Sequence, residues 1–443
     1  MRPTSLSPFS NTMSFSAVRG CIIRNPICRR IGRGFWQLSR DLPRRIPLQK
    51  FRTLRRWSGR PAGWHLTVAD YLAVHPGRGW QKLVGESGSY ERVSPITAGS
   101  RLPACFDPPQ TVTWEEERVI YLEGCRYWGE YGGAVIAHDE LLIGELSPDV
   151  WGVERHAIFN KVKLPPICPL PGLTAVISTP EANVNYSHWL MDLLPRLNLL
   201  ERAGFGPSIV DRYLINLGGG HYERETLALA GIPFDKVKYV SDASHFACER
   251  IVSTNLRSKH WQHSLPGWVP NYLRGLAGPP DFQSASSHRL YLTRESASFR
   301  RVLNEKELLP TLERHGFEIV DPARLSVREQ ARLFSRSEVI VSPHSSAMTN
   351  LVFCRPGTAV LEIFPADYFD VSFWTAATMA GSRYYATMGE RSGLRAPQTY
   401  IEGRRQDVLI RPEALNDAIC QILNGTDNSP GKSVPRCGSL EAT

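Results

Sequence analysis

The chain of 443 residues joins an apolar run to a polar turn in one segment, Val339-Ile340-Val341-Ser342-Pro343-His344-Ser345-Ser346-Ala347-Met348-Thr349-Asn350. The apolar start is typical of a buried strand. The His and hydroxyl side chains precede Leu351-Val352-Phe353, which indicates that a helix begins here. A helix start has free backbone N–H groups and a partial positive charge, so we expect it to bind a phosphate. Ser, Thr and Asn also cap helices for structural reasons alone, and that alternative stays open.

Strand and helix patterns alternate around this turn. The expected elements are strands at 289–293, 317–320 and 359–364 and helices at about 304–316 and 326–337. Alternation of this kind predicts a parallel sheet with helices on both faces. Ligands of such sheets bind beyond the carboxyl ends of the strands, and Arg294, His344 and Glu362 lie at or near such ends.

A weaker alternation precedes residue 279, where Pro279-Pro280 begins a stretch of linker composition. Its expected elements are strands at 173–178, 213–217, 237–240 and 250–253 and helices at 186–203 and 222–230. The fold class is therefore α/β, with two Rossmann-like domains facing a cleft and a small antiparallel β meander, at about 111–145, before the first. The expected divisions are a basic tail at 1–62, a first domain at 63–280, a second domain at 286–425 and a tail at 426–443. A final helix at 413–423 could cross back to brace the first domain.

The helix expected from Tyr186 places His188, Asp192 and Arg196 on one face, because residues four apart are neighbours on a helix. Pro195 lies inside the pattern, removes one backbone hydrogen bond and is expected to kink the helix. A His, an Asp and an Arg on one face suit a general base with its orienting and charge partners. A half-buried His paired with a neighbouring carboxylate is the alternative.

Three segments together resemble the signatures of glycosyltransferase family 61, in the expected order. They are residues 185–197, residues 291–294 with 300–308, and residues 343–358 with Glu362. The resemblance implies a two-domain GT-B-like fold and an inverting transfer from a nucleotide sugar, with no need for a DxD metal motif. No two aspartates in the chain are separated by a single residue, which agrees with a diphosphate held by cations rather than by a metal bridge.

The residues and the resemblance together assign the expected site. His188 and Asp192 are the catalytic pair, and either could be the base. The expected donor-binding residues are Arg294, Arg300, Arg301, His344, Ser345, Ser346, Thr349, Asn350 and Glu362, supported by Asn185, Arg196, Asn304 and Glu305. For Arg300 and Arg301 the alternative is a solvated surface pair, for Glu362 a pairing with a nearby Arg, and for Asn304 and Glu305 a role as helix caps.

The expected activity is that of an inverting, metal-independent hexosyl- or pentosyltransferase, which moves a sugar from a nucleotide sugar to a glycan or polysaccharide hydroxyl. No cofactor or metal is expected beyond the donor substrate. The family often has glycines and an alanine after the His, whereas this chain has Ser345, Ser346 and Ala347. Their side chains narrow the approach of a diphosphate to the backbone. A catalytically weakened nucleotide-sugar-binding or scaffolding protein is therefore the alternative.

The basic character of the chain is confined to its start. Residues 1–60 hold 13 Arg and one Lys against one acid, a net charge of +13, whereas the whole chain is +9 and the remainder therefore −4. This excludes nucleic-acid binding as the main function, because that would need a basic folded module. The tail could contact an anionic membrane surface or serve as an organelle transit peptide, and the alternative is a disordered tail or an over-extended translation start. No apolar run of 18 residues exists, and the nine cysteines are dispersed without a CxxC, so we expect a cytoplasmic protein, peripheral to a membrane at most.

Overall fold

The computed structural model describes residues 57–99, 102–107, 110–149, 152–256, 265–278, 282, 288–391, 393 and 396–427. Most of the two expected tails therefore lies outside the described residues. The last part of the first tail packs on the body, because Ser58 and Arg60 are buried and the Arg60 guanidinium donates to the carbonyls of Phe159 and Lys161 at 2.8 and 2.9 Å. No helix in the described ranges is both long and apolar enough to cross a membrane.

The first half of the chain forms a mixed sheet of nine strands in the order β1-β8-β7-β6-β12-β9-β10-β11, with β2 on β6. The strands are β1 Trp64–His65, β2 Gly79–Gly85, β6 Glu117–Trp128, β7 Ala134–Ile136, β8 Leu142–Ile143, β9 Cys168–Val176, β10 Arg212–Ile215, β11 Val237–Tyr239 and β12 His245–Thr254. The expectation of a separate meander was wrong. β6 pairs with β12 over most of the length of β12, and this antiparallel ladder joins the meander to the parallel strands β12, β9, β10 and β11.

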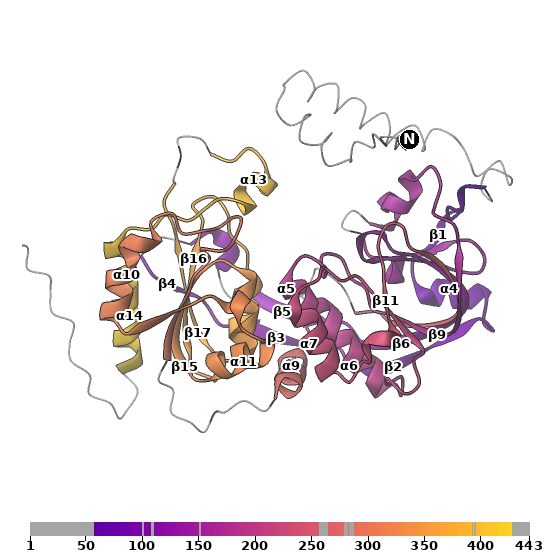
Figure 1. Ribbon diagram of the computed structural model, residues 1–443, viewed down its shortest axis with the longest axis horizontal. Helices are drawn as coiled ribbons and strands as arrows, with labels where there is room; N and C mark the ends of the chain where they lie inside the picture. The colour runs from indigo at the N-terminus through magenta and orange to yellow at the C-terminus, as the bar shows by residue number, and fades with distance from the viewer. Residues whose placement is uncertain are drawn as a thin grey trace, which may run out of the picture.

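The second half forms a parallel sheet of six strands in the order β14-β13-β15-β16-β17-β4. The strands are β4 Ile96–Thr97, β13 His288–Leu292, β14 Phe317–Val320, β15 Ser337–Pro343, β16 Ala359–Phe364 and β17 Arg383–Met388. β16 is buried along its whole length, as expected for a strand covered on both faces. β4 comes from the first half of the chain and extends this sheet at β17. β3 Gly88–Arg92 and β5 Gln110–Trp114 form a separate two-stranded ribbon toward the middle of the molecule (Figure 1).

Helices cover both sheets. They are α4 Val68–Val74, α5 Tyr186–His188, α6 Leu194–Arg202, α7 His221–Leu229, α9 Val269–Ala277, α10 Glu305–Arg314, α11 Val327–Ser335, α12 Ser372–Met379, α13 Tyr400–Arg404 and α14 Pro412–Asp427, with short helical turns η2 Ala104–Phe106, η3 Glu130–Gly132, η4 Gly144–Leu146, η5 Val153–Arg155, η6 Ala157–Asn160, η8 Phe234–Lys236, η9 Pro322–Arg324 and η10 Ser346–Phe353. The capping box of Ser326 and Glu329 is confirmed at the start of α11. The final helix α14 does not brace the first half, because it packs beside α10 on the six-stranded sheet (Figure 1).

The helix expected over 186–203 is divided by a π-helical turn, η7 Trp189–Leu193, between α5 and α6. The N–H of Leu194 bonds to the carbonyl of Trp189, five residues earlier, immediately before Pro195. Pro195 therefore stands in the first turn of α6, where its missing N–H costs little. Pro195 was expected inside one continuous helix, but the π-helical turn ends just before it and a new helix begins there. Turns of this kind often mark functional sites.

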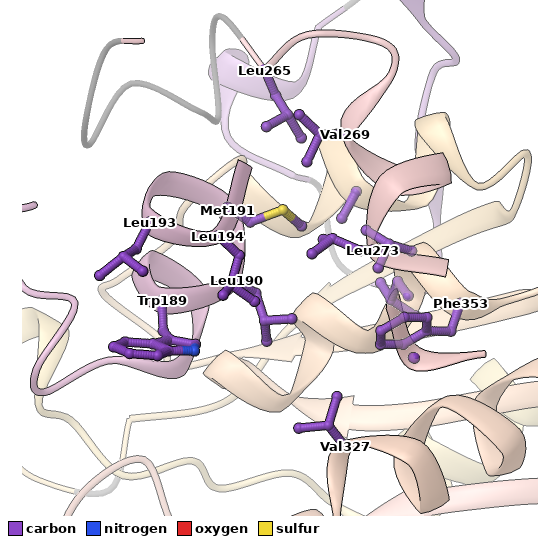
Figure 2. Packing of buried hydrophobic residues seen from close by; sticks show 14 of the residues in the cluster. Trp189, Leu190, Met191, Leu193, Leu194, Leu265, Val269, Leu273, Val327 and Phe353 are labelled. Atoms are coloured by element: carbon purple, nitrogen blue, oxygen red, sulfur yellow. The ribbon is translucent and has the colours of Figure 1, made fainter. Parts of the chain in front are cut away.

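One apolar core runs between the two halves of the molecule. It joins Trp189 and Met191 of η7 to Leu273 of α9, Val327 of α11 and Phe353 of η10 (Figure 2). These residues are buried and come from both sides of the break near residue 280. Side chains shared by two sheets in this way fix the position of α5 and η7 against η10.

Candidate functional site

A cavity of about 890 Å³ lies between the two halves. Asn185, His188 and Arg196 line it from the α5–α6 side. Arg300 and Ser346 line it from the other half, together with His344, Tyr368, Asp370, Ser372, Phe373, Tyr400 and Arg404. The structure thus brings residues of all three sequence segments to one cavity, because α5 and η10 pack directly on each other.

His188 stands at the centre of a carboxylate–imidazole–carboxylate arrangement. Its Nδ1 lies 2.6 Å from Oδ2 of Asp192, and its Nε2 lies 3.3 Å from Oε2 of Glu181. Burial lowers the pKa of His188, but hydrogen bonds to the two carboxylates outweigh that effect and raise the pKa to about 9. Asp192 is fully buried and does not line the cavity, so it reaches the cavity only through His188.

Glu181 is a cavity residue that the sequence patterns did not reveal. Its φ of 63° is in the left-handed region, which costs a non-glycine residue of order 1 kcal/mol or more. Its carboxylate also lies 3.7 Å from Nη2 of Arg404 in the other half. Glu181 therefore links His188 to the opposite wall of the cavity. No spacing or motif marks it, because it lies in the loop before Asn185 and meets both partners only in the folded chain.

Arg196 and Asn185 position the surrounding backbone. The Arg196 guanidinium is buried and donates to the carbonyls of Asp192, Thr254 and Leu256 at 3.1, 3.3 and 2.5 Å. It therefore fixes the chain after β12 against η7. Asn185 accepts the N–H of Ser187 at 2.9 Å and caps α5. Both residues also contribute to the cavity wall.

His344 reaches the cavity from the carboxyl end of β15, and Glu362 supports it from behind. Nδ1 of His344 bonds to Oε1 of Glu362, and Tyr384 donates its hydroxyl to the other carboxylate oxygen. Glu362 lies within β16, is fully buried and does not line the cavity, so its expected contact with a ribose or sugar hydroxyl does not occur in this arrangement. The hydrogen bonds of Glu362 go to His344 and Tyr384, whereas Arg300 acts on Glu362 through its charge.

Burial disfavours the charged forms of both His344 and Glu362. Burial lowers the pKa of His344 well below its usual value, and the neighbouring Arg300, Arg294 and Arg404 lower it further. Burial also raises the pKa of Glu362 well above its usual value. The imidazole of His344 therefore lies close to arginine charges that oppose its protonation, and Arg300 and Arg404 bring positive charge to this wall of the cavity.

The three expected arginines occupy three different positions. Arg294 donates to the backbone carbonyls of Phe299 and Arg300 at 2.9 and 3.1 Å, and it supports the loop without lining the cavity. Arg301 is exposed and pairs with Asp407 at 3.4 Å, which is the expected surface alternative. Only Arg300 of the three lines the cavity, with a φ of 56° and 8 % of its surface exposed.

The Arg300 side chain retains hydrogen-bonding capacity. Its Nη1 donates to the carbonyl of Arg404 at 3.0 Å, whereas its buried Nε has no hydrogen-bond partner in the described part of the chain. The hydroxyl of Ser345 is likewise buried without a hydrogen-bond partner there. Buried polar groups are normally paired, so the Nε of Arg300 in the cavity wall is consistent with a ligand that would complete it. Ser345 lies between two lining residues but does not itself line the cavity.

Two of the residues assigned to the donor form contacts between the halves instead. Thr349 donates its hydroxyl to Ser187 at 2.7 Å, and Asn350 accepts the hydroxyl of Tyr186 at 2.9 Å. Both Thr349 and Asn350 are fully buried and absent from the cavity wall. These two hydrogen bonds hold η10 against α5, and we therefore assign neither Thr349 nor Asn350 to the donor.

Asn304 and Glu305 also lie away from the cavity wall. Asn304 stands at the N-cap position of α10, but its side chain donates to the carbonyl of Ile410 at 2.9 Å and accepts no helix N–H. Glu305 accepts the hydroxyls of Tyr291 and Thr293 at 2.8 and 2.9 Å. Both residues brace the second half, in a way that differs from the simple caps expected.

Comparison with known families agrees with this geometry. Residues 186–361 match the family model described as Glycosyltransferase 61. This segment belongs to glycosyltransferase family 61. The family 61 segment begins at Tyr186 in α5 and ends at Leu361 in β16, so it includes His188, Arg300 and His344. It leaves out Glu181 and the α13 residues Tyr400 and Arg404, which join the same cavity from outside the matched range.

Other comparisons add little. No curated protein matches this chain. Among solved structures, a crystal structure of a D-isomer specific 2-hydroxyacid dehydrogenase family protein from Aeromonas salmonicida subsp. salmonicida A449 shares 12 % identity with the chain. The match covers 62 % of this chain and 98 % of that chain, with a TM-score of 0.17, which is too low to carry an argument about fold or function.

Proposed function

We propose that this protein is an inverting glycosyltransferase that uses a nucleotide sugar without a bridging metal ion and transfers the sugar to a hydroxyl of a glycan or polysaccharide. The observation that carries the proposal is one cavity lined by His188, Arg300 and His344, which come from the three segments that resemble family 61 and all lie in the matched range. In this proposal the two halves act as a GT-B-like pair, with the donor against the six-stranded sheet and the acceptor against α5.

The donor side of the cavity has the charge that a diphosphate needs. Arg300 and Arg404 bring guanidinium groups to the wall, and a guanidinium suits phosphate oxygens because it donates several N–H groups in a fixed plane. Ser346 lies at the start of η10, where backbone N–H groups face outward. Tyr368 and Tyr400 contact each other at 5.8 Å between ring centroids and offer aromatic surface for the rest of the nucleotide.

The acceptor side suits a general base. We assign His188 as the base and Asp192 as its orienting partner, because His188 lines the cavity and Asp192 does not. The acceptor oxygen attacks the anomeric carbon as the bond to the leaving diphosphate breaks, and Nε2 of His188 takes the acceptor proton. Glu181 must give up its contact with Nε2 for this to occur. A single displacement of this kind inverts the anomeric centre.

The proposed activity is tested by incubating the full chain with a panel of nucleotide sugars and glycan acceptors and measuring released nucleotide diphosphate. We expect turnover with one class of donor, and no increase on adding Mg²⁺ or Mn²⁺, because arginines stabilise the leaving group. Donor binding without turnover across the panel would favour the weakened, nucleotide-sugar-binding alternative. The observation behind that alternative is Ser345 and Ser346, whose side chains stand where the family often has glycines.

Glu181→Gln is expected to move the pH dependence of this activity to lower pH. A His188 with a pKa of about 9 is protonated below that pH and cannot accept a proton, so wild-type kcat should rise with pH towards about 9. Glutamine removes the charge that helps to raise this pKa. The acidic limb of the pH–rate profile should therefore shift down, and kcat near neutral pH should increase.

The matched control is Glu318→Gln, which breaks another His–carboxylate pair, with His288 at 2.6 Å, on the exposed edge of the six-stranded sheet. It should leave the profile unchanged. If Glu181→Gln instead abolishes turnover at every pH while the fold is retained, then Glu181 is the base and our assignment to His188 is wrong.

A further inference from the structure

Three chain segments bring nitrogen and oxygen ligands together at the far edge of the nine-stranded sheet. His65 ends β1, His75 caps the C-terminus of α4, and Asp139 lies in the turn between β7 and β8. β1 and α4 lie beside each other at the end of the molecule opposite α10 and α14 (Figure 1). Nothing in the proposed transfer reaction uses these side chains.

The two imidazoles converge on one carboxylate oxygen. Nε2 of His65 lies 2.8 Å from Oδ2 of Asp139, and Nε2 of His75 lies 3.1 Å from the same oxygen. The three ligand atoms all lie within 4.8 Å of one another. The other carboxylate oxygen accepts the N–H of Leu141 at 3.2 Å, which orients the carboxylate. The side chain of His65 is 13 % exposed, that of His75 is 28 % exposed and that of Asp139 is 18 % exposed. An ion from solvent can therefore reach all three.

We propose that His65, His75 and Asp139 bind a divalent transition-metal ion of the zinc class, with the fourth position open to water. Two imidazole nitrogens and one carboxylate oxygen are a ligand set that favours zinc over magnesium or calcium, which prefer oxygen ligands alone. Zinc–nitrogen bonds of about 2.0–2.1 Å in a tetrahedron separate ligand atoms by roughly 3.3 Å. The two nitrogen–oxygen separations would therefore open by only a few tenths of an ångström.

The surrounding residues can orient the ligands. Nδ1 of His138 forms a hydrogen bond with the hydroxyl of Tyr71 at 2.7 Å. The His138 ring also packs edge-on against the ring of His75, with 4.5 Å between the ring centroids. Arg78 lies near His138 and brings a positive charge to this part of the surface. Arg78 itself is the nearby cation that the bound metal must tolerate.

The proposed metal would act on stability rather than on chemistry. β1 pairs with β8 over only two residues, and α4 has only seven residues, so neither is expected to be stable alone. An ion would tie both to the β7–β8 turn, and its binding free energy would add to folding. Leu66 and Thr67, next to His65, line the cavity between the two halves, so the ion would also hold that part of the cavity wall.

The test uses the full chain, stripped with a chelator and titrated with Zn²⁺ alone. We expect one equivalent of tightly bound zinc, a thermal midpoint raised by several degrees, and no such rise with Mg²⁺. His65→Asn, His75→Asn and Asp139→Asn should each lose the zinc and the thermal shift. The control His288→Asn, which removes a histidine from an exposed His–carboxylate pair, should retain both.

Two results would overturn the proposal: no stoichiometric zinc on the wild-type chain, or retention of the zinc by all three ligand variants. Should the variants fail to fold, Co²⁺ on the wild-type chain decides instead. The visible absorption of tetrahedral Co²⁺ with nitrogen and oxygen ligands supports the site, and a spectrum of aqueous Co²⁺ opposes it. Neither readout depends on glycosyl transfer, so this inference and the proposed function can fail separately.

Discussion

His188→Gln is expected to lower kcat by about 10²–10⁴ while leaving donor binding nearly unchanged, because a positioned general base contributes an effect of that size. Glutamine can still hydrogen-bond to Asp192, so the buried carboxylate keeps a partner at its Oδ2. Without such a partner a buried charge costs several kcal/mol, which would confuse loss of function with loss of fold. Steady-state release of nucleotide diphosphate measures kcat, and equilibrium binding measures the affinity for the donor.

Two controls accompany this variant. His288→Gln changes a histidine that also pairs with a carboxylate but lies far from the cavity wall, and it should preserve kcat. Asp192→Asn keeps the shape of the orienting residue and removes its charge. It should lower kcat as well, because it no longer favours the imidazole form with its proton on Nδ1. An unchanged kcat in His188→Gln would refute the assignment of His188 as base.

Arg300→Met is expected to raise the KM for the nucleotide sugar by about 10–100-fold, because a hydrogen bond to a charged group contributes roughly 1.5–3 kcal/mol. Arg300 lines the cavity with a buried guanidinium whose Nε has no hydrogen-bond partner among the described residues. Methionine keeps the apolar stem and, like arginine, carries a Cβ at the strained φ of 56°. The comparison therefore isolates the loss of the charged group from any change in backbone strain.

The adjacent Arg301→Met provides the matched control. Arg301 is exposed, pairs with Asp407 and does not line the cavity, and an exposed pair of this kind contributes little to stability. Its KM should stay at the wild-type value. Equal effects of the two substitutions would show that the positive charge of the loop acts at long range, and that Arg300 makes no specific contact with the diphosphate. Salt dependence separates these outcomes, because long-range effects weaken as ionic strength rises.

Local patterns predicted most of the elements of the second half. Apolar runs bounded by turn residues placed β16 at its observed limits, and the Ser326–Glu329 capping box placed the start of α11. Apolar runs and capping boxes depend only on residues a few positions apart, so they predict a local element whatever the rest of the fold. The spacing of His188 and Asp192 was informative in the same way, because the two side chains still meet at 2.6 Å across the π-helical turn.

Long-range packing overrode several other predictions. The strands of the expected meander belong to the nine-stranded sheet because β6 pairs with β12, which lies more than a hundred residues later in the chain. Thr349 and Asn350 look like donor ligands in sequence, yet their side chains are used by Ser187 and Tyr186 across the join between the halves. The position of Glu362 near a strand end predicted contact with a ligand, but its carboxylate forms hydrogen bonds with Tyr384 and His344 on neighbouring elements.

The sequence alone determined which segments carry the chemistry, because three ordered signatures and the alternation of strands and helices are local and periodic features. Tertiary structure alone decided which side chains face the cavity. Arg300 rather than Arg294 or Arg301 lines it, and Glu181 and Arg404, separated by more than two hundred residues, join it from opposite walls. The physical reason is that hydrogen-bond partners and burial are set by packing between distant segments, whereas motifs record only residue types and spacing.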